Sequence, residues 1–238
     1  MKVSLLGYGK MGKEIEKILK ERGHEVILRI DENNPYELTP SNLAKSNVAI
    51  DFSIPQAAFQ NIMMCFEADV PIVSGTTGWL DKFDEVTETC KSKNKSFFYA
   101  SNYSLGVNLF FALNEWLARV MNKFPAYNVN IEEVHHNQKK DAPSGTAISL
   151  ANDIINQLDR KNNWKLTSEV QEDVIGIKAG REGQVPGIHT VTYDSDEDFI
   201  QITHSAKSRK GFALGAVLAA EFLQDKKGVY SMKDLLKL

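Results

Sequence analysis

A glycine-rich loop near the amino terminus most constrains the fold of this chain. The letters GYGKMG at 7–12 place Gly7, Gly9 and Gly12 in the G-x-G-x-x-G spacing. An apolar run at 2–6, typical of a strand, precedes the loop, and apolar residues at helical spacing follow it. In this order the glycines allow a tight turn, a close approach of a pyrophosphate to the backbone, and close packing of helix on strand. The loop therefore predicts a dinucleotide site at a helix amino terminus.

Short apolar runs and helical patterns alternate through the first hundred residues. We predict strands at 2–6, 25–30, 48–52, 71–74 and 96–99. They are rich in β-branched and aromatic residues and nearly continuous in apolar ones, as strands buried on both faces are. The alternation predicts an α/β fold with a Rossmann-type parallel sheet covered by helices.

The pattern changes after this region. Residues 106–124 predict a long amphipathic helix, and 127–136 alternate as a one-sided strand does. Further strands are expected at 173–179, 188–194 and 198–204. The apolar stripe expected on the long helix consists of Leu109, Leu113, Trp116, Leu117 and Val120. These elements predict a second α+β domain with an open mixed sheet of about four strands.

The domain boundaries follow from these patterns. We expect 1–103 and 209–238 to form the dinucleotide-binding domain and 104–208 the second domain. The closing stretch, 209–236, is expected to be helical throughout and to pack back on the first domain.

Composition excludes several classes of protein. The 238 residues carry a net charge of −3, which leaves no basic excess for binding nucleic acid through its phosphates. No apolar run reaches the roughly 20 residues of a membrane span. The amino-terminal apolar run is too short for a signal peptide. Two cysteines, Cys65 and Cys90, are too few for a disulfide framework. A soluble, cytoplasmic protein without a nucleic-acid or membrane partner is expected.

Asp31 stands where a dinucleotide site needs a carboxylate. It ends the second predicted strand, about twenty residues after the glycine loop, where an acid can accept hydrogen bonds from the ribose hydroxyls. Glu32 follows it, and two carboxylates would repel a 2′-phosphate. We therefore predict a preference for NADH over NADPH, although Arg29 is near in sequence.

The letters EVHHNQKKDAPSGTA at 133–147 concentrate ionisable side chains before a helix start. If the strand continues to 136, His135 and His136 point to opposite faces. The helix that follows begins near 144–146, where backbone N–H groups and hydroxyls suit a carboxylate or phosphate. Two lysines at 139 and 140 add positive charge. The segment predicts an anion site beside a proton donor.

A solvated loop and a zinc site are weaker interpretations of this segment. A solvated loop accounts for the lysines but not for the adjacent histidines with a Pro-Ser-Gly-Thr turn. A zinc site would have to borrow ligands such as His189 or His204, and it lacks the short repeated spacing of known sites. No metal is expected.

The same segment resembles the signature E-x-H-H-x-x-K-x-D-A-P-S-G-T-A of 4-hydroxy-tetrahydrodipicolinate reductases, also called dihydrodipicolinate reductases. The resemblance extends to GYGKMG, DFSIP at 51–55, SGTTGW at 74–79, ASNYSLGVN at 100–108 and RKGFALGAVLAAEFL at 209–223.

Roles for individual residues follow from this resemblance. It implies that His135 and Lys139 are the catalytic proton donors. The residues implied to hold the substrate carboxylates are His136, Ser144, Gly145, Thr146 and Arg209. The implied cofactor contacts are Gly7, Tyr8, Gly9, Lys10, Met11, Gly12, Asp31, Gly75, Thr76, Thr77, Ala100, Ser101, Asn102 and Tyr103, the last four in a segment that closes over the cofactor at the domain hinge.

The resemblance also implies the reaction. It is the NADH- or NADPH-dependent reduction of a small cyclic dicarboxylate, 4-hydroxy-tetrahydrodipicolinate, to tetrahydrodipicolinate in lysine biosynthesis via diaminopimelate. It further implies a homotetramer formed through the open sheet of the second domain. A related reductase of another dicarboxylate and a dinucleotide sensor without turnover stay open as alternatives, and the histidine and lysine of the motif argue against the sensor.

Overall fold

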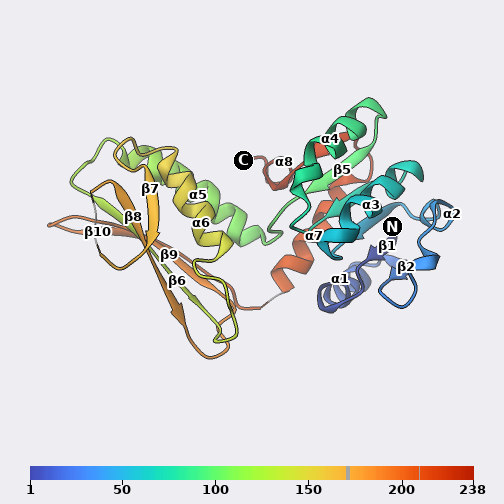
Figure 1. The fold of residues 1–238 in the computed structure, drawn as a ribbon, viewed down its shortest axis with the longest axis horizontal. Helices are drawn as coiled ribbons and strands as arrows, with labels where there is room; N and C mark the ends of the chain where they lie inside the picture. The colour runs from blue at the N-terminus through green and yellow to red at the C-terminus, as the bar shows by residue number, and fades with distance from the viewer. Residues whose placement is uncertain (170–171, 209) are drawn as a thin grey trace. The chain divides into compact units, whose positions relative to one another are not determined.

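A computed structural model of the protein describes residues 1–169, 172–208 and 210–238. The chain divides into two compact units, Met1–Leu105 with Lys210–Leu238, and Gly106–Arg209 (Figure 1). Each unit has its own sheet and its own apolar core. Within the described residues no helix is long and apolar enough to cross a membrane.

The first unit is built on a six-stranded sheet in which every neighbouring pair is parallel. Its strand order is β11-β5-β4-β3-β1-β2. The strands are β1 (Lys2–Leu6), β2 (Glu25–Ile30), β3 (Val48–Asp51), β4 (Ile72–Ser74), β5 (Ser96–Tyr99) and β11 (Gly228–Tyr230). The predicted parallel sheet and its first five strands are confirmed.

Helices cover both faces of this sheet. One face packs against α1 (Lys10–Glu21), α7 (Lys210–Leu223) and α8 (Met232–Leu236). The other packs against α2 (Pro40–Leu43), α3 (Pro55–Glu67) and α4 (Phe83–Ser92). Two short 3-10 turns are η1 (Pro35–Glu37) and η2 (Leu80–Lys82). Burial on both faces explains why these strands lack the alternation of a half-exposed sheet.

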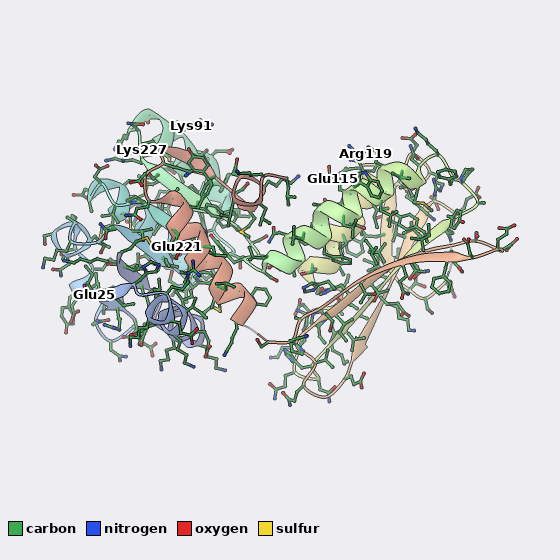
Figure 2. All side chains as sticks on the ribbon, turned by 180° about the vertical axis from the view of Figure 1, so that it is seen from behind. Glu25, Lys91, Glu115, Arg119, Glu221 and Lys227 are labelled. Atoms are coloured by element: carbon green, nitrogen blue, oxygen red, sulfur yellow. The ribbon has the colours of Figure 1, made fainter. Side chains whose placement is uncertain are left out.

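The carboxyl-terminal segment returns to the first unit, as the sequence predicts. The helix α7 packs beside α1, and Glu221 on α7, labelled in Figure 2, accepts hydrogen bonds of 2.8 Å from Nε and Nη2 of Arg22. The expectation of a continuous helix to residue 236 is wrong, because α7 ends at Leu223 and β11 then pairs with β5. Gly228 has φ +116°, a backbone conformation that no helix contains.

The second unit contains a five-stranded mixed sheet in the order β10-β9-β6-β8-β7. Its strands are β6 (Asn128–His135), β7 (Asn163–Leu166), β8 (Val174–Arg181), β9 (Ile188–Asp194) and β10 (Phe199–Ser205). The predicted four strands are present, and the count of about four is corrected to five. The extra strand β7 is mostly exposed at the sheet edge, so its four residues carry no apolar pattern.

Two helices, α5 (Leu105–Met121) and α6 (Gly145–Ile155), share an apolar core with one face of this sheet. The predicted stripe on α5 is largely wrong: Leu109, Leu113 and Trp116 are 51%, 45% and 52% exposed. Of the predicted stripe, Leu117 does lie in the core, and Phe110, which the stripe omits, lies there with it. Apolar side chains project from several sides of this helix, so their spacing alone does not identify the buried face.

Candidate active site

The carboxyl ends of the parallel strands bring the predicted nucleotide residues to one edge of the first sheet. Gly7 follows β1, Asp31 follows β2, Ser53 lies just after β3, and Gly75 follows β4. Strand order reverses between β1 and β3, which lie next to each other while β2 lies on the far side of β1. Open parallel sheets bind ligands at such a point.

The glycine loop is closely packed at two of its glycines and open at the third. Gly7 has φ +91°, and a Cβ there would lie 2.2 Å from the carbonyl oxygen of Phe52. A Cβ on Gly12 would lie 2.5 Å from the carbonyl oxygen of Gly7. At Gly9 a Cβ would meet nothing within 4 Å. This opening at the amino end of α1 fits a pyrophosphate against the backbone.

Two pockets adjoin this loop. One of about 540 Å³ is lined by Gly7, Tyr8, Gly9, Ile30, Asp31, Glu32, Asn33, Pro35, Leu38, Phe52, Ser53, Ile54, Ala57 and Asn61. A smaller one of about 280 Å³ is lined by Met11, Phe52, Ser53, Pro55, Gly75, Thr76 and Thr77. An apolar wall with a few carboxylate and amide groups fits a nucleotide. Eight of the predicted cofactor residues line these two pockets: Gly7, Tyr8, Gly9, Met11, Asp31, Gly75, Thr76 and Thr77. Gly12 packs against Gly7.

A buried carboxylate to which the sequence assigns no role holds the loops of both pockets. Asp51, at the end of β3, accepts hydrogen bonds of 2.7 Å from Oγ of Ser53 and 2.7 Å from Oγ1 of Thr76. Further donors are Nδ2 of Asn61 at 2.9 Å and Oγ of Ser74 at 3.0 Å. Burial raises the pKa of Asp51, although the four donors act against this rise. The carboxylate thus fixes the turns after β3 and β4.

Asp31 and the nearby Arg29 have separate partners. Its Oδ1 accepts a hydrogen bond of 2.8 Å from the backbone N–H of Asn33. The guanidinium of Arg29 turns to Glu16, with 2.7 Å from Nη2 to Oε1. The hydrogen bond from Arg29 is the main cause that lowers the pKa of Glu16, so that carboxylate is charged. Arg29 is therefore already paired with an acid.

The segment 100–103 lies directly after β5, and its last side chain is buried. Tyr103 is 2% exposed, and its hydroxyl donates a 2.8 Å hydrogen bond to the carbonyl oxygen of Ser74. Its ring lies 5.5 Å from that of Phe52. Tyr103 therefore supports the pocket wall from behind, and its predicted contact with the cofactor stays a prediction, as do those of Lys10, Ala100, Ser101 and Asn102. The predicted substrate residue Arg209 lies outside the described residues.

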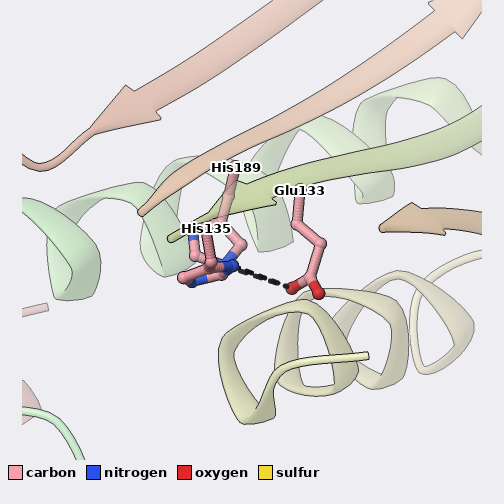
Figure 3. A group of neighbouring side chains, drawn as sticks. All are labelled: Glu133, His135 and His189. Carbon is pink, nitrogen blue, oxygen red and sulfur yellow. Dashed lines mark ion pairs between the residues drawn. The ribbon is translucent and has the colours of Figure 1, made fainter. Parts of the chain in front are cut away.

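The histidine motif of the second unit spans the end of β6 and the loop that follows. Glu133 and His135 lie two residues apart on β6 and are 1% and 7% exposed. His136 lies beyond the strand and is half-buried. Figure 3 shows Glu133, His135 and His189 gathered above α6. The strand thus places one histidine of the pair in a buried polar cluster.

The Glu133 carboxylate lies at the centre of this cluster. Its Oε2 is 3.8 Å from Nδ1 of His135 and 3.6 Å from Nε2 of His189. Both oxygens accept a 3.1 Å hydrogen bond from the backbone N–H of Ser144. Burial raises the pKa of Glu133, but His189 and Ser144 lower it by more, to about 2. The carboxylate is ionised at neutral pH.

His135 is neutral in the ligand-free site. Burial is the largest cause that lowers its pKa, and the nearby His189 lowers it further. Glu133 raises the pKa, while Lys139 and Arg181 lower it, and the net value is about 4. Within the described residues, Nδ1 of His135 is buried without a hydrogen-bond partner. Added negative charge would favour protonation of this ring.

The helix α6 begins where the motif predicts a helix start. Ser144 is the N-cap residue, and its Oγ accepts a 3.2 Å hydrogen bond from the N–H of Ala147. The same Oγ lies 3.0 Å from Nε2 of His189. The first N–H groups of a helix have no partner within the helix, and those of Gly145 and Thr146 stand at this end. The end of α6 therefore suits a carboxylate.

The lysine of the motif lies in the loop between β6 and α6. Nζ of Lys139 is 2.8 Å and 3.0 Å from the two carboxylate oxygens of Asp141. Arg181, at the end of β8, donates from Nε to the carbonyl oxygen of Lys139 at 3.2 Å and from Nη2 to that of Asp141 at 2.6 Å. The arginine anchors the backbone of the loop that carries Lys139.

The cluster could also ligate a metal ion by distance alone. Glu133, His135 and His189 each offer a ligand atom within 4.8 Å of the others. However, Nη1 of Arg181 lies 3.5 Å from Oε1 of Glu133, and a guanidinium so close repels a cation. The guanidinium beside Glu133 therefore argues against a cation at this cluster.

Three residues of this cluster have no role that the sequence alone assigns. Glu133 lies within the motif, where it can be recognised, but His189 is suggested only as a conceivable zinc ligand. Arg181 carries no local signal at all. Strand register brings them together, because Glu133 lies opposite His189 and His135 lies opposite Arg181.

Comparisons with known proteins agree with this geometry. The family described as "Dihydrodipicolinate reductase, N-terminus" matches residues 1–103, and "Dihydrodipicolinate reductase, C-terminus" matches 106–236. A 4-hydroxy-tetrahydrodipicolinate reductase of Christiangramia forsetii is 54% identical over 99% of this chain and 98% of its own length. One of Staphylococcus aureus is 35% identical over 99% of this chain and 100% of its own.

The fold has a solved counterpart. The structure of dihydrodipicolinate reductase from Paenisporosarcina sp. TG-14, with dipicolinate bound, has a TM-score of 0.80 and 22% identity. The match covers 97% of each chain, and it shows that the two share a fold. With both parts of the family matched and relatives aligned over nearly their whole length, the chain belongs to the dihydrodipicolinate reductase family.

Proposed function

We propose that the protein is a 4-hydroxy-tetrahydrodipicolinate reductase, which uses a reduced pyridine nucleotide to form tetrahydrodipicolinate in lysine biosynthesis via diaminopimelate. The observation that carries this proposal is a family match over both units combined with a complete motif around His135 and Lys139. The competing idea of a sensor without turnover leaves the buried histidine and the loop lysine without a use.

The residues of the second unit support the chemistry of a cyclic dicarboxylate. The nucleotide supplies the hydride. The end of α6, with Ser144, Gly145 and Thr146, and the neighbouring His136 hold the carboxylates through N–H groups and positive charge. His135 and Lys139 supply the proton that completes the reduction. Arg209, outside the described residues, is proposed as a further carboxylate contact.

The residues of the first unit support nucleotide binding. The open backbone at Gly9 receives the pyrophosphate, Asp31 accepts hydrogen bonds from the ribose, and 75–77 border the nicotinamide. Lys10 at the start of α1 and the segment 100–103 complete the proposed site. These contacts rest on the pockets and on the glycine geometry described above.

NADH is expected to be the preferred nucleotide. A 2′-phosphate would approach Asp31 and Glu32, while Arg29 is held by Glu16. We expect kcat/KM to be about tenfold or more higher with NADH than with NADPH, since 1.4 kcal/mol of repulsion corresponds to a factor of ten. Asp31→Ser removes one of the two carboxylates, so the ratio of kcat/KM with NADH to kcat/KM with NADPH should fall. A preference of the wild-type enzyme for NADPH would show that this assignment is wrong.

Binding of a dicarboxylate is expected to take up a proton at His135. The ring has a pKa of about 4 without ligand, and two added carboxylates raise it. Between about pH 4 and the pKa in the complex, affinity should therefore fall as pH rises, by up to about tenfold per pH unit.

Calorimetric titration of dipicolinate at pH 7 in phosphate and in Tris measures this uptake. The expected value approaches one proton for the wild type and near zero for His135→Gln. Equal heats in the two buffers for the wild type would mean that no proton is taken up on binding. Lys139 alone would then be the proposed proton donor.

The two units are proposed to divide the work, with nucleotide binding in 1–103 and 209–238, and substrate binding and assembly in 104–208. The face of the second sheet turned away from α5 and α6 is the proposed contact surface of a homotetramer. It includes Asn128, Asn130, Glu132 and Val134 of β6, which alternate with the buried positions of that strand. A cytoplasmic location also stays a prediction.

One assay tests the function itself. Freshly generated 4-hydroxy-tetrahydrodipicolinate and NADH are supplied to the wild-type enzyme, and the absorbance of the reduced nucleotide is followed. Substrate-dependent loss of absorbance is expected. Nucleotide binding without turnover would favour the sensor, and turnover with only another dicarboxylate or imino acid would favour a related reductase.

A further inference from the structure

Glu133 is a buried carboxylate for which the proposed reaction provides no role. It is 1% exposed, whereas its neighbour Glu132 is exposed on the other face of β6 and pairs with Nζ of Lys178 at 2.6 Å. A buried charge is costly unless its partners compensate it. The partners of Glu133 therefore indicate what it is for.

Three parts of the substrate site meet at this carboxylate. The first is the amino end of α6, whose Ser144 N–H reaches both oxygens at 3.1 Å. The second is His135, whose Nδ1 lies 3.8 Å away across the face of β6 (Figure 3). The third is Arg181, whose Nη1 lies 3.5 Å from Oε1.

Arg181 extends the connection to the loop lysine. Its Nε and Nη2 bind the backbone carbonyl oxygens of Lys139 and Asp141, on either side of one intervening residue. The guanidinium therefore lies between the Glu133 carboxylate and the loop backbone. Movement of Glu133 would release this loop as well as the end of α6.

We propose that Glu133 is a positioning residue for the reduction: its charge holds the carboxylate-binding end of α6, His135 and the Lys139 loop in one arrangement, and it favours the protonated ring of His135 when a dicarboxylate is bound. The proposal rests on the proposed function, in which His135 supplies a proton. Other charged or titratable groups facing this pair are Arg181, Lys139 and Asp141 from the strand end and loop, His189 on β9, and His204, which lies opposite His189 on β10.

A purely structural role is the alternative. Glu133 could serve only to accept the Ser144 N–H and so fix the start of α6. Glutamine at this position retains an acceptor oxygen and nearly the same volume, but it removes the charge. Glu133→Gln therefore separates the electrostatic role from the helix cap, and Glu88→Gln makes the same chemical change at an exposed position on α4 of the first unit.

Three measurements on the full-length protein test the proposal: kcat with NADH, thermal unfolding, and the NMR titration of the His135 ring in the dipicolinate complex. For Glu133→Gln we expect kcat to fall about tenfold or more, and the His135 midpoint to fall by roughly one pH unit or more, because an opposite charge within about 4–6 Å is lost. For Glu88→Gln we expect kcat to stay within about twofold of the wild-type value and the His135 midpoint to be unchanged.

The outcomes separate this proposal from the function on which it rests. An unchanged His135 midpoint in Glu133→Gln, even with a lowered unfolding temperature, would leave only the structural role and overturn the proposal. If Glu133→Gln does not fold, Glu133→Asp replaces it, because aspartate keeps the charge. This variant should retain the wild-type His135 midpoint with a reduced kcat, and a His135 midpoint that falls as expected for loss of the charge would overturn the proposal. The titration needs no turnover, so an inactive wild-type enzyme would refute the function without deciding this result.

Discussion

Replacing His135 with alanine is expected to lower kcat by about 10²–10⁴-fold, the usual contribution of a positioned acid. His135 is buried beside an ionised carboxylate, and its Nε2 lies 3.1 Å from the position of a Cβ on Gly187. The ring is thus closely fitted. Nucleotide affinity should be unchanged, because the glycine loop belongs to the other unit.

Lys139→Ala is expected to lower kcat over a similar range, since it removes the second proposed proton donor and positive charge beside the carboxylate site. Stopped-flow absorbance of NADH gives kcat, and quenching of protein fluorescence gives nucleotide binding. Lys91→Ala, which removes an exposed lysine on α4, is the matched control, and its kcat and nucleotide affinity should equal those of the wild type. Wild-type turnover in either His135→Ala or Lys139→Ala would remove that residue from the mechanism.

Gly7→Ala is expected to abolish tight nucleotide binding and to destabilise the protein. The residue has φ +91°, and its Cβ would lie 2.2 Å from the Phe52 carbonyl oxygen, so the turn must move away from β3. Strain of this kind costs about 1–3 kcal/mol per residue, and the displaced turn also carries the opening at Gly9. The free energy of unfolding should therefore fall, and the Kd for NADH should rise.

Gly9→Ala gives the informative comparison. Among the described residues, no protein atom lies within 4 Å of the position of its Cβ. The free energy of unfolding should therefore change by less than about 1 kcal/mol. The added methyl group occupies the space proposed for the pyrophosphate, so the Kd for NADH should still rise about tenfold or more. Chemical denaturation and NADH titration of both variants check this. Unchanged NADH affinity in Gly9→Ala would show that the pyrophosphate does not bind at Gly9.

Local signals in the sequence were sufficient where one segment forms one feature. The glycine loop, its flanking strand and its helix are adjacent in the chain, and Asp31 ends the neighbouring strand. The start of α6 is likewise encoded by Ser144 and the residues beside it. The resemblance to the reductase family rested on a motif of this continuous kind, and the family match confirms it.

Periodicity failed where more than one arrangement satisfies it. The helix α5 is apolar on several sides, so the sequence did not reveal that Leu109, Leu113 and Trp116 stay exposed. The edge strands β7 and β11 are mostly exposed or only half-buried, so neither carries the apolar run that marks a buried strand. Which face is buried, and which short segments pair, depends on the packing partners that the fold provides.

The sequence by itself determined the parallel nucleotide fold, the loop that opens it, and the motif that carries His135 and Lys139. Only the tertiary structure decided that Glu133, His189 and Arg181 surround these residues, and that Asp51 ties together the turns after β3 and β4. The physical reason is that the charge of a buried carboxylate is compensated by groups from several strands. Strand register, which no single segment encodes, brings those groups within reach.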